Sequence, residues 1–268
     1  TRIITPSIYR TVQMDLSALD QLLQSAPTEQ IGEIPSSNIQ LSLPNPEGGT
    51  SLFNIYYSPI MEQALADQFP EIRTYAGYDE NGNYIRFDLT PQGFHAMVFP
   101  LFGDKWFIDP YSFGNIDPEY YQVYYRKEHH RDVEEFLDCS TIGESVLNRE
   151  DIYDDNLSRY GDCQHREYRL AISATGEYTT FHGGTVALAQ AAQVTTMNRV
   201  NGVFEQELAI RMTFIGNNNL IIYTNAGSDP FTNGTPGTMI NENQTNTDAV
   251  IGSGNYDIGH VFGTNSGG

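Results

Sequence analysis

The sequence predicts a protein of the α+β or α/β class, with a β-rich N-terminal module and then a partial mixed sheet backed by long helices. Two observations support this. Short alternating runs separated by turn residues fill the first part of the chain. Further on, a strand-like run, a long helical run and a second strand-like run follow one another, which is the order of an α/β unit. We place the modules at residues 1–126 and 166–268, joined by an acidic connecting segment at 127–165.

The N-terminal module contains patterns for two helices and several strands. Leucines on one face predict a helix over 15–25, with Asp15 as its N-cap. Apolar runs around a Pro/Gly turn predict a hairpin within 38–57. A short helix is predicted to begin at Ser58, and residues 72–126 have the pattern of an antiparallel meander with one more strand.

The C-terminal module alternates strand and helix patterns. A Tyr-, Ile- and Thr-rich run over residues 166–184 predicts the first strand, and helical apolar spacing over 185–212 predicts a long helix. The next strand is predicted at Leu220–Tyr223, where β-branched and aromatic residues return. Residues 239–251 favour a second helix, and residues 256–262 a strand or buried turn.

The charge of the chain excludes some partners. There are 34 Asp and Glu residues against 14 Lys and Arg, a net charge of −20. A surface this negative repels phosphate groups, so we expect neither nucleic acid nor an anionic membrane as a partner. No apolar run approaches the roughly 20 residues that cross a bilayer. The chain begins TRIITPSIYR, without Met or a signal-peptide pattern, and we expect a processed secreted protein or a trimmed piece of one.

The two cysteines, Cys139 and Cys163, lie within the connecting segment. They could form a disulfide with each other, pair with partners outside this sequence, or stay free.

The six histidines do not form a recognisable zinc motif. No His-Glu-x-x-His is present, and His129 and His130 are adjacent, so on a helix they would point about 100° apart. His260 is a stronger candidate because Asp257, three residues earlier, could orient its imidazole. The simpler interpretation is a structural histidine that is hydrogen-bonded within the fold.

One loop has the oxygen-rich composition that calcium prefers. Residues 225–233 (NAGSDPFTN) offer carbonyl and carboxylate oxygens, but without the spacing of a recognised calcium loop. Ordinary turn chemistry is the favoured interpretation. The residues alone therefore indicate no catalytic centre.

The C-terminal module nevertheless resembles a known family over residues 166–268. The strings that carry the resemblance are YRLAISATGEYTTFHGG, TVALAQAAQVTTMNRVNGVFEQELAIRM, DPFTN, ENQ and NYDIGHVF. They resemble secreted bacterial reprolysin-like zinc metallopeptidases of the metzincin clan, of the Bacteroidetes type. The N-terminal module is similar to the pro-region that precedes such enzymes, in LPNPEGGTSLFNIYYSPIM, TPQGFHAM and YQVYYRK.

The resemblance implies where zinc chemistry would lie. In such enzymes the zinc helix, His-Glu-x-x-His-x-x-Gly-x-x-His, comes further downstream, and a Met-turn follows it. Residues 166–268 would then be the upper subdomain of a metzincin-like catalytic domain, with the zinc ligands of that domain expected beyond Gly268. Asp257 and His260 would belong to the scaffold near the active site and would not bind the metal.

The resemblance also suggests how a precursor could be kept inactive. Pro-region side chains of metzincins often occupy the open zinc position, and a thiolate suits that role because zinc binds sulfur well. Cys139 is the candidate switch, and Asp138 could act similarly as a carboxylate. The alternatives are a Cys139–Cys163 disulfide and a cysteine partner elsewhere.

We therefore expect the N-terminal part of a secreted zinc metalloendopeptidase precursor, inactive by itself. Its partners would be its own C-terminal catalytic portion and protein or peptide substrates, and its cofactor would be zinc, with calcium as a further candidate. The alternative is a non-catalytic, secreted two-domain binding protein. A His-Glu-x-x-His motif encoded downstream would distinguish the two.

Overall fold

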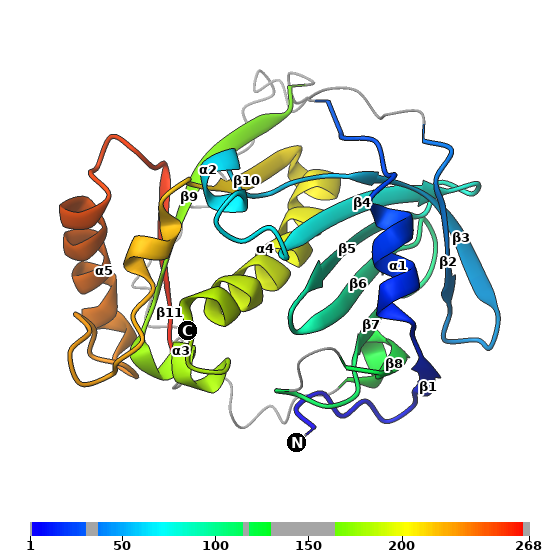
Figure 1. The fold of residues 1–268 in the computed structure, drawn as a ribbon, viewed down its shortest axis with the longest axis horizontal. Helices are drawn as coiled ribbons and strands as arrows, with labels where there is room; N and C mark the ends of the chain where they lie inside the picture. The colour runs from blue at the N-terminus through cyan, green and yellow to red at the C-terminus, as the bar shows by residue number, and fades with distance from the viewer. Residues whose placement is uncertain (1, 31–36, 115–117, 130–163, 265–268) are drawn as a thin grey trace, which may run out of the picture.

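The computed structural model describes residues 2–30, 37–114, 118–129 and 164–264. Two sheets lie on either side of one long helix, α4 (Val186–Leu208) (Figure 1). We call residues 2–129 the N-terminal module and residues 164–264 the C-terminal module.

The N-terminal module is one antiparallel sheet of eight strands, in the order β1-β8-β7-β6-β5-β4-β3-β2. From β2 to β8 each strand pairs with the next along the chain, as expected for a meander, and β1 joins the far edge. The strands are β1 (Arg10–Gln13), β2 (Gln40–Pro44), β3 (Thr50–Tyr57), β4 (Arg73–Asp79), β5 (Tyr84–Thr90), β6 (Gly93–Phe99), β7 (Trp106–Pro110) and β8 (Tyr120–Tyr125).

Helix α1 (Leu16–Leu23) covers the face of the large sheet that points away from α4. Its N-cap is Asp15, as predicted, and the carboxylate accepts a hydrogen bond from the Ala18 amide at 3.0 Å. Leu19 and Leu23 are buried against the aromatic core of the sheet. The leucine spacing therefore predicted both the helix and its buried face.

The helix predicted at Ser58 begins later. Helix α2 is Gln63–Ala66, with Glu62 as its N-cap. Residues 60–61 are extended, because Ile60 and Glu62 exchange backbone hydrogen bonds with Phe214 of the C-terminal module. A pairing between residues so far apart in the chain overrides the local helical pattern.

The C-terminal module contains a small parallel sheet in the order β10-β9-β11. A mixed sheet was predicted, but these three described strands all run in the same direction. The elements are β9 (Arg166–Ala174), α3 (Gly176–Phe181), α4, β10 (Ile210–Phe214), α5 (Pro236–Val250) and β11 (Ile258–Phe262). Short 3₁₀ helices lie at Arg126–Glu128 and Asn218–Ile221.

Two local predictions in this module were wrong. The first strand ends at Ala174, because Thr175 caps α3 by accepting a hydrogen bond from the Tyr178 amide at 3.2 Å. The second strand is β10, not residues 220–223. Helix α4 ends at Leu208, and the left-handed conformation of its C-cap residue Ala209, with a φ of 54°, turns the chain into β10.

The region around the predicted second strand is held as a turn instead. The side chain of Asn218 accepts a hydrogen bond from the Ile172 amide at 2.8 Å, and residues 218–221 form a 3₁₀ helix. Only Ile222 retains a strand-like contact, an isolated bridge to Ala174.

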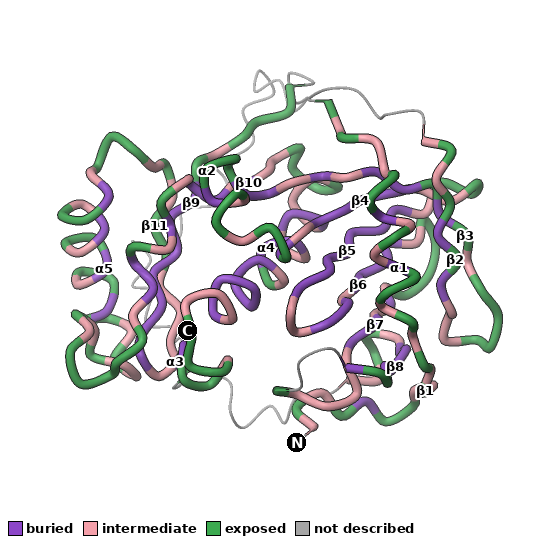
Figure 2. The backbone as a smooth tube through the Cα atoms, viewed as in Figure 1, coloured by how far each residue is buried: buried purple, intermediate pink, exposed green. Residues whose placement is uncertain are grey.

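Helix α4 is covered on two sides. Ala191, Val194 and Met197 pack into the core of the small sheet. Other residues of the helix contact β5, where every residue is buried, as the purple tube in Figure 2 shows. Among the described helices, none is both long and apolar enough to span a bilayer.

Candidate functional site

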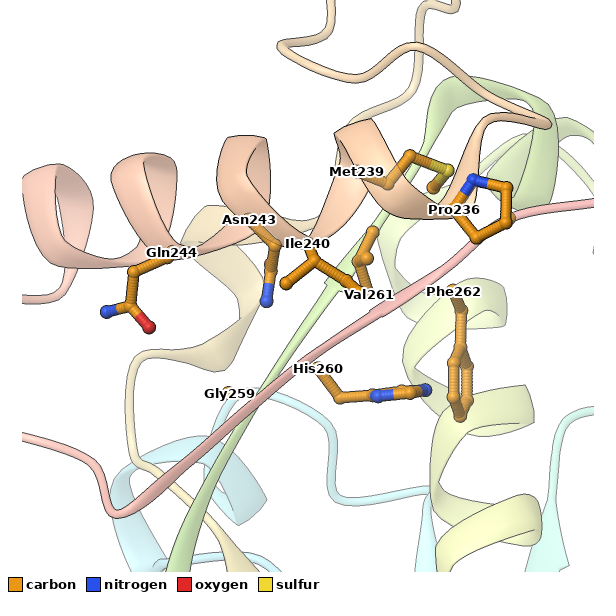
Figure 3. Close-up of a pocket in the computed structure, with 10 residues that line it drawn as sticks. Pro236, Met239, Ile240, Asn243, Gln244, Gly259, His260, Val261 and Phe262 are labelled. Atoms are coloured by element: carbon orange, nitrogen blue, oxygen red, sulfur yellow. The ribbon is translucent and has the colours of Figure 1, made fainter. Parts of the chain in front are cut away.

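His260, one of the two residues proposed from sequence as scaffold, lines a groove between α5 and β11 (Figure 3). Asp257, the other, directly precedes β11. Its volume is about 470 Å³. Met239, Ile240 and Asn243 line it from the helix, and residues 259–263 line it from the strand. Within the described chain β11 pairs only with β9, so its outer edge has no neighbouring strand.

Asp257 does not orient His260. Its carboxylate binds Arg169 on β9, accepting from Nη2 at 2.8 Å, from Nε at 3.1 Å and from the backbone amide at 2.8 Å. These hydrogen bonds lower the pKa of Asp257 to about 2. The carboxylate therefore fixes the entry of the chain into β11.

His260 lies on β11 with its ring edge-on to Phe262, the ring centres 5.2 Å apart. The residue is exposed, yet partial loss of water around the imidazole lowers its pKa below the usual value. The structural histidine that the sequence favoured, hydrogen-bonded within the fold, stays a prediction.

The described residues do not fit a zinc ion. Among them no three His, Cys, Asp or Glu side chains are close enough to hold a metal. We therefore derive no catalytic step through zinc from these residues.

The remaining sequence-based candidates divide into two groups. Asp138, Cys139 and Cys163 lie outside the described residues. In the candidate calcium loop, Asp229 accepts hydrogen bonds from the Gly176 and Phe231 amides, and Asn225 accepts one from the Gly227 amide. The contacts with Gly227 and Phe231 are local turn contacts, whereas the contact with Gly176 connects the loop to the start of α3.

The largest group of polar contacts lies between the two modules. We call Glu29, Ser58, Arg86, Glu205 and Arg211 the charge cluster. Glu205 on α4 accepts from Arg86 Nη2 at 2.6 Å and Nε at 2.8 Å, and from Arg211 Nε at 2.5 Å. Arg211 also donates to both carboxylate oxygens of Glu29, at 2.8 and 2.9 Å.

Ser58 closes the cluster into a ring. Its hydroxyl donates to Glu29 at 2.5 Å and accepts from Arg86 Nη2 at 3.0 Å. The Arg86 side chain has no exposed surface, and that of Glu205 is 9% exposed. Burial alone would raise the pKa of Glu205, but the two neighbouring guanidinium groups lower it below its usual value.

A second set of contacts continues along the same face of α4. Asp88 on β5 accepts from the Thr195 hydroxyl at 2.7 Å and lies 3.1 Å from Nδ1 of His95. Asp109, 1% exposed, accepts from Arg199 at 2.5 Å and from the Tyr124 hydroxyl at 2.7 Å. Four acid–base pairs thus connect the modules, the fourth being the exposed Lys105–Glu207 pair at 3.7 Å.

Sequence reasoning missed this set of residues, although two signals were present. Arg86 and Asp88 occupy alternate positions in the apolar strand YIRFDL, where solvent-facing charges would be the usual interpretation. Helix α4 also carries amide side chains along its length, among them Asn198. A polar side chain that becomes buried needs a partner, and Asn198 accepts a hydrogen bond from Arg86 Nη1 at 2.8 Å.

Comparison with known proteins concerns the C-terminal module. Residues 164–268 match the sequence model of the reprolysin-like metallopeptidase family M12B. This part of the chain resembles a reprolysin-like metallopeptidase. The match begins beside β9 and takes in α4, α5 and β11, so the groove and two of the five residues of the charge cluster lie inside it. Comparison with curated proteins finds no match to the chain.

The match supports a metallopeptidase in general terms, and the family is in general zinc-dependent. The groove at β11 and the junction with the N-terminal module lie at opposite edges of the small sheet.

Proposed function

We propose that this chain is the N-terminal part of a secreted zinc metalloendopeptidase made as a precursor. In this proposal the N-terminal module is a pro-region, and residues 166–268 are the upper part of the catalytic domain. The intact protein would hydrolyse peptide bonds of protein or peptide substrates with zinc-activated water. The observation that carries the proposal is the family match over residues 164–268.

In this proposal catalysis is assigned to residues outside the 268. The 268 residues contain no His-Glu-x-x-His. A peptidase built on this module therefore needs ligands and a general base from outside these residues. In the described sheet β11 is an edge strand, and its outer edge could accept a further strand.

Two measurements test the proposal. The reading frame downstream of Gly268 should encode His-Glu-x-x-His within about 60 residues. The 268-residue chain, purified with and without added zinc, should not cleave a quenched fluorescent peptide library. Zinc-dependent cleavage by this chain alone would contradict the inactive-fragment part of the proposal, and a downstream frame without the motif would contradict the peptidase assignment.

A second candidate function is a secreted binding protein without catalytic activity. The groove of about 470 Å³ beside an open strand edge favours it, because an extended peptide could add to β11 as a further strand. The exposed Ile240 would then contact the peptide. Binding of peptides by the purified chain, together with a downstream frame that lacks the zinc motif, would favour this candidate.

A further inference from the structure

Neither module can satisfy the charge cluster alone. The N-terminal module supplies Arg86, Glu29 and Ser58, and the C-terminal module supplies Glu205 and Arg211. Separation would leave Arg86 without its bidentate carboxylate partner and Arg211 without either carboxylate oxygen of Glu29. The loss of one partner from a buried ion pair is strongly destabilising. The bound state of the two modules is therefore favoured over the separated state.

The apolar core is shared in the same way. The backbone of Ile60 and Glu62 pairs with Phe214, at 2.8 and 2.9 Å, and so adds the N-terminal module to the edge of β10. One buried cluster contains side chains of both modules: Ile60, Met61, Leu65 and Ile72 from the first, and Leu170, Ile172, Ala191, Val194, Met197, Met212 and Phe214 from the second. This continuity is typical of the interior of one domain and not of a transient interface.

A glycine on α4 shows how closely the surfaces fit. A Cβ at Gly202 would lie 2.6 Å from Cζ of Phe99, a side chain on β6 that is only 6% exposed. The helix therefore has no room for a side chain where the aromatic ring of the other module contacts it.

From these contacts we propose that the N-terminal module stays bound to the C-terminal module after the chain between them is cut. The two pieces would then be the non-covalent subunits of one stable complex. The partner of the α4–β10 surface is then residues 2–129 as a separate chain. If the N-terminal module is a pro-region, as proposed above, cleavage of the connecting segment does not release it. The binding claim itself does not depend on peptidase activity.

The test uses the full chain with a recognition sequence for a site-specific protease inserted between Asp132 and Val133. Both cysteines then fall in the C-terminal piece, so no disulfide can connect the two pieces. After cutting, size-exclusion chromatography with light scattering at about 1 μM in 1 M NaCl should give one species of about 30 kDa containing both pieces in equal amounts. Two separately eluting pieces would overturn the proposal.

Variants show whether the charge cluster holds the pieces together. In the cut protein, Glu205→Gln should raise the rate at which a labelled N-terminal piece exchanges out of the complex by roughly a hundredfold or more. Glu207→Gln is the matched control, because Glu207 lies on the same helix and its carboxylate makes only an exposed pair with Lys105. It should change the rate less than about threefold.

A milder variant covers the case in which Glu205→Gln does not fold. The Tyr84 hydroxyl donates to Glu205 at 2.8 Å and accepts from Arg86 at 3.1 Å. Tyr84→Phe removes both contacts and keeps the ring, and should speed exchange roughly tenfold. If neither variant speeds exchange beyond the Glu207→Gln control, the charge cluster does not hold the pieces together.

Discussion

The two edges of the small sheet differ in what covers them. At β10 the N-terminal module pairs with the strand, shares its apolar core and closes a ring of buried and partly buried charges. At β11 the described chain leaves the strand edge open beside a groove, and the nearest ion pair, Arg169–Asp257, is exposed. The β10 edge is covered like the interior of a domain, whereas the β11 edge is exposed like a surface.

This difference suggests that the β10 edge contributes mainly to stability and the β11 edge mainly to function. Buried charges with several hydrogen bonds each fix the modules in one arrangement, since any shift would leave charges unpaired in a low-dielectric site. The β11 edge has few such constraints and could accept a further strand or a peptide at little cost. Functional partners are therefore expected at β11, and large effects of mutation on stability at β10.

The largest effect is expected at Arg86. Arg86→Ala should lower the free energy of unfolding by about 3–5 kcal/mol, because it leaves the buried Glu205 carboxylate short of a partner. Urea denaturation measures this loss. Arg169→Ala, which breaks the exposed pair beside β11, is the control and should have a much smaller effect. If Arg86→Ala and Arg169→Ala lower the free energy of unfolding by the same amount, the proposed difference between the β10 and β11 edges is wrong.

Two histidines extend the comparison to pH. Burial lowers the pKa of His182 to about 4, and its Nδ1 has no hydrogen-bond partner among the described residues. A depressed histidine pKa means that the unfolded chain binds the proton more readily. Stability conferred by the neutral ring is therefore present above about pH 6.5 and is lost progressively as the pH falls toward 4, by up to about 3 kcal/mol.

His182→Gln should flatten the fall in thermal stability between pH 6.5 and 4. The ring of His182 contacts Phe113 of the N-terminal module, with centres 5.6 Å apart, whereas the exposed His260 lies at the open edge. His260→Gln is the matched control and should change the pH profile less. If His260→Gln changes the pH dependence of thermal stability more than His182→Gln does, the pH-sensitive histidine lies at the β11 edge, which contradicts this prediction.

Two glycines offer a smaller test of packing. Gly202→Ala should destabilise the protein by about 1–2 kcal/mol despite the better helix propensity of alanine, because its Cβ would overlap Phe99. Phe99→Leu in the same chain should recover part of this loss. Gly237→Ala near the start of α5, where no atom lies within 4 Å of the new Cβ, should be neutral or slightly stabilising. Differential scanning calorimetry of Gly202→Ala, of the double variant with Phe99→Leu, and of Gly237→Ala measures these changes in stability. Equal effects of Gly202→Ala and Gly237→Ala would contradict the close fit at Phe99.

The smallest effect is expected in the groove. Ile240 is 67% exposed, so Ile240→Ser should change the free energy of unfolding by less than about 0.5 kcal/mol. If the groove binds extended peptides, the same variant should still weaken that binding in a titration. A large loss of stability would mean that this face is covered in the folded protein.

Elements with a strong local period were predictable from sequence. The meander strands, the leucine face of α1 with its Asp15 cap, and the long helix α4 all followed from residue spacing. The second strand did not, because the Leu220–Tyr223 run looks more strand-like than β10 and only the hydrogen bonds of Asn218 place it in a turn.

The site was less predictable than the fold. Asp257 was proposed to orient His260, but it binds Arg169 instead, which lies 88 residues away, and no local pattern connects the two. The charge cluster depends on contacts between residues more than one hundred positions apart, such as Arg86 with Glu205. Cys139, Asp138 and the proposed disulfide to Cys163 stay predictions.

Native-state hydrogen exchange tests the contrast between the two edges most directly. The amides of Phe214 and Glu62, which join β10 to the N-terminal module, should exchange only through global unfolding. Amides of β11 that face its open edge should exchange at least about a hundredfold faster. If the Phe214 and Glu62 amides exchange as fast as those of the β11 edge, the two modules separate without unfolding and the shared interior proposed here is wrong.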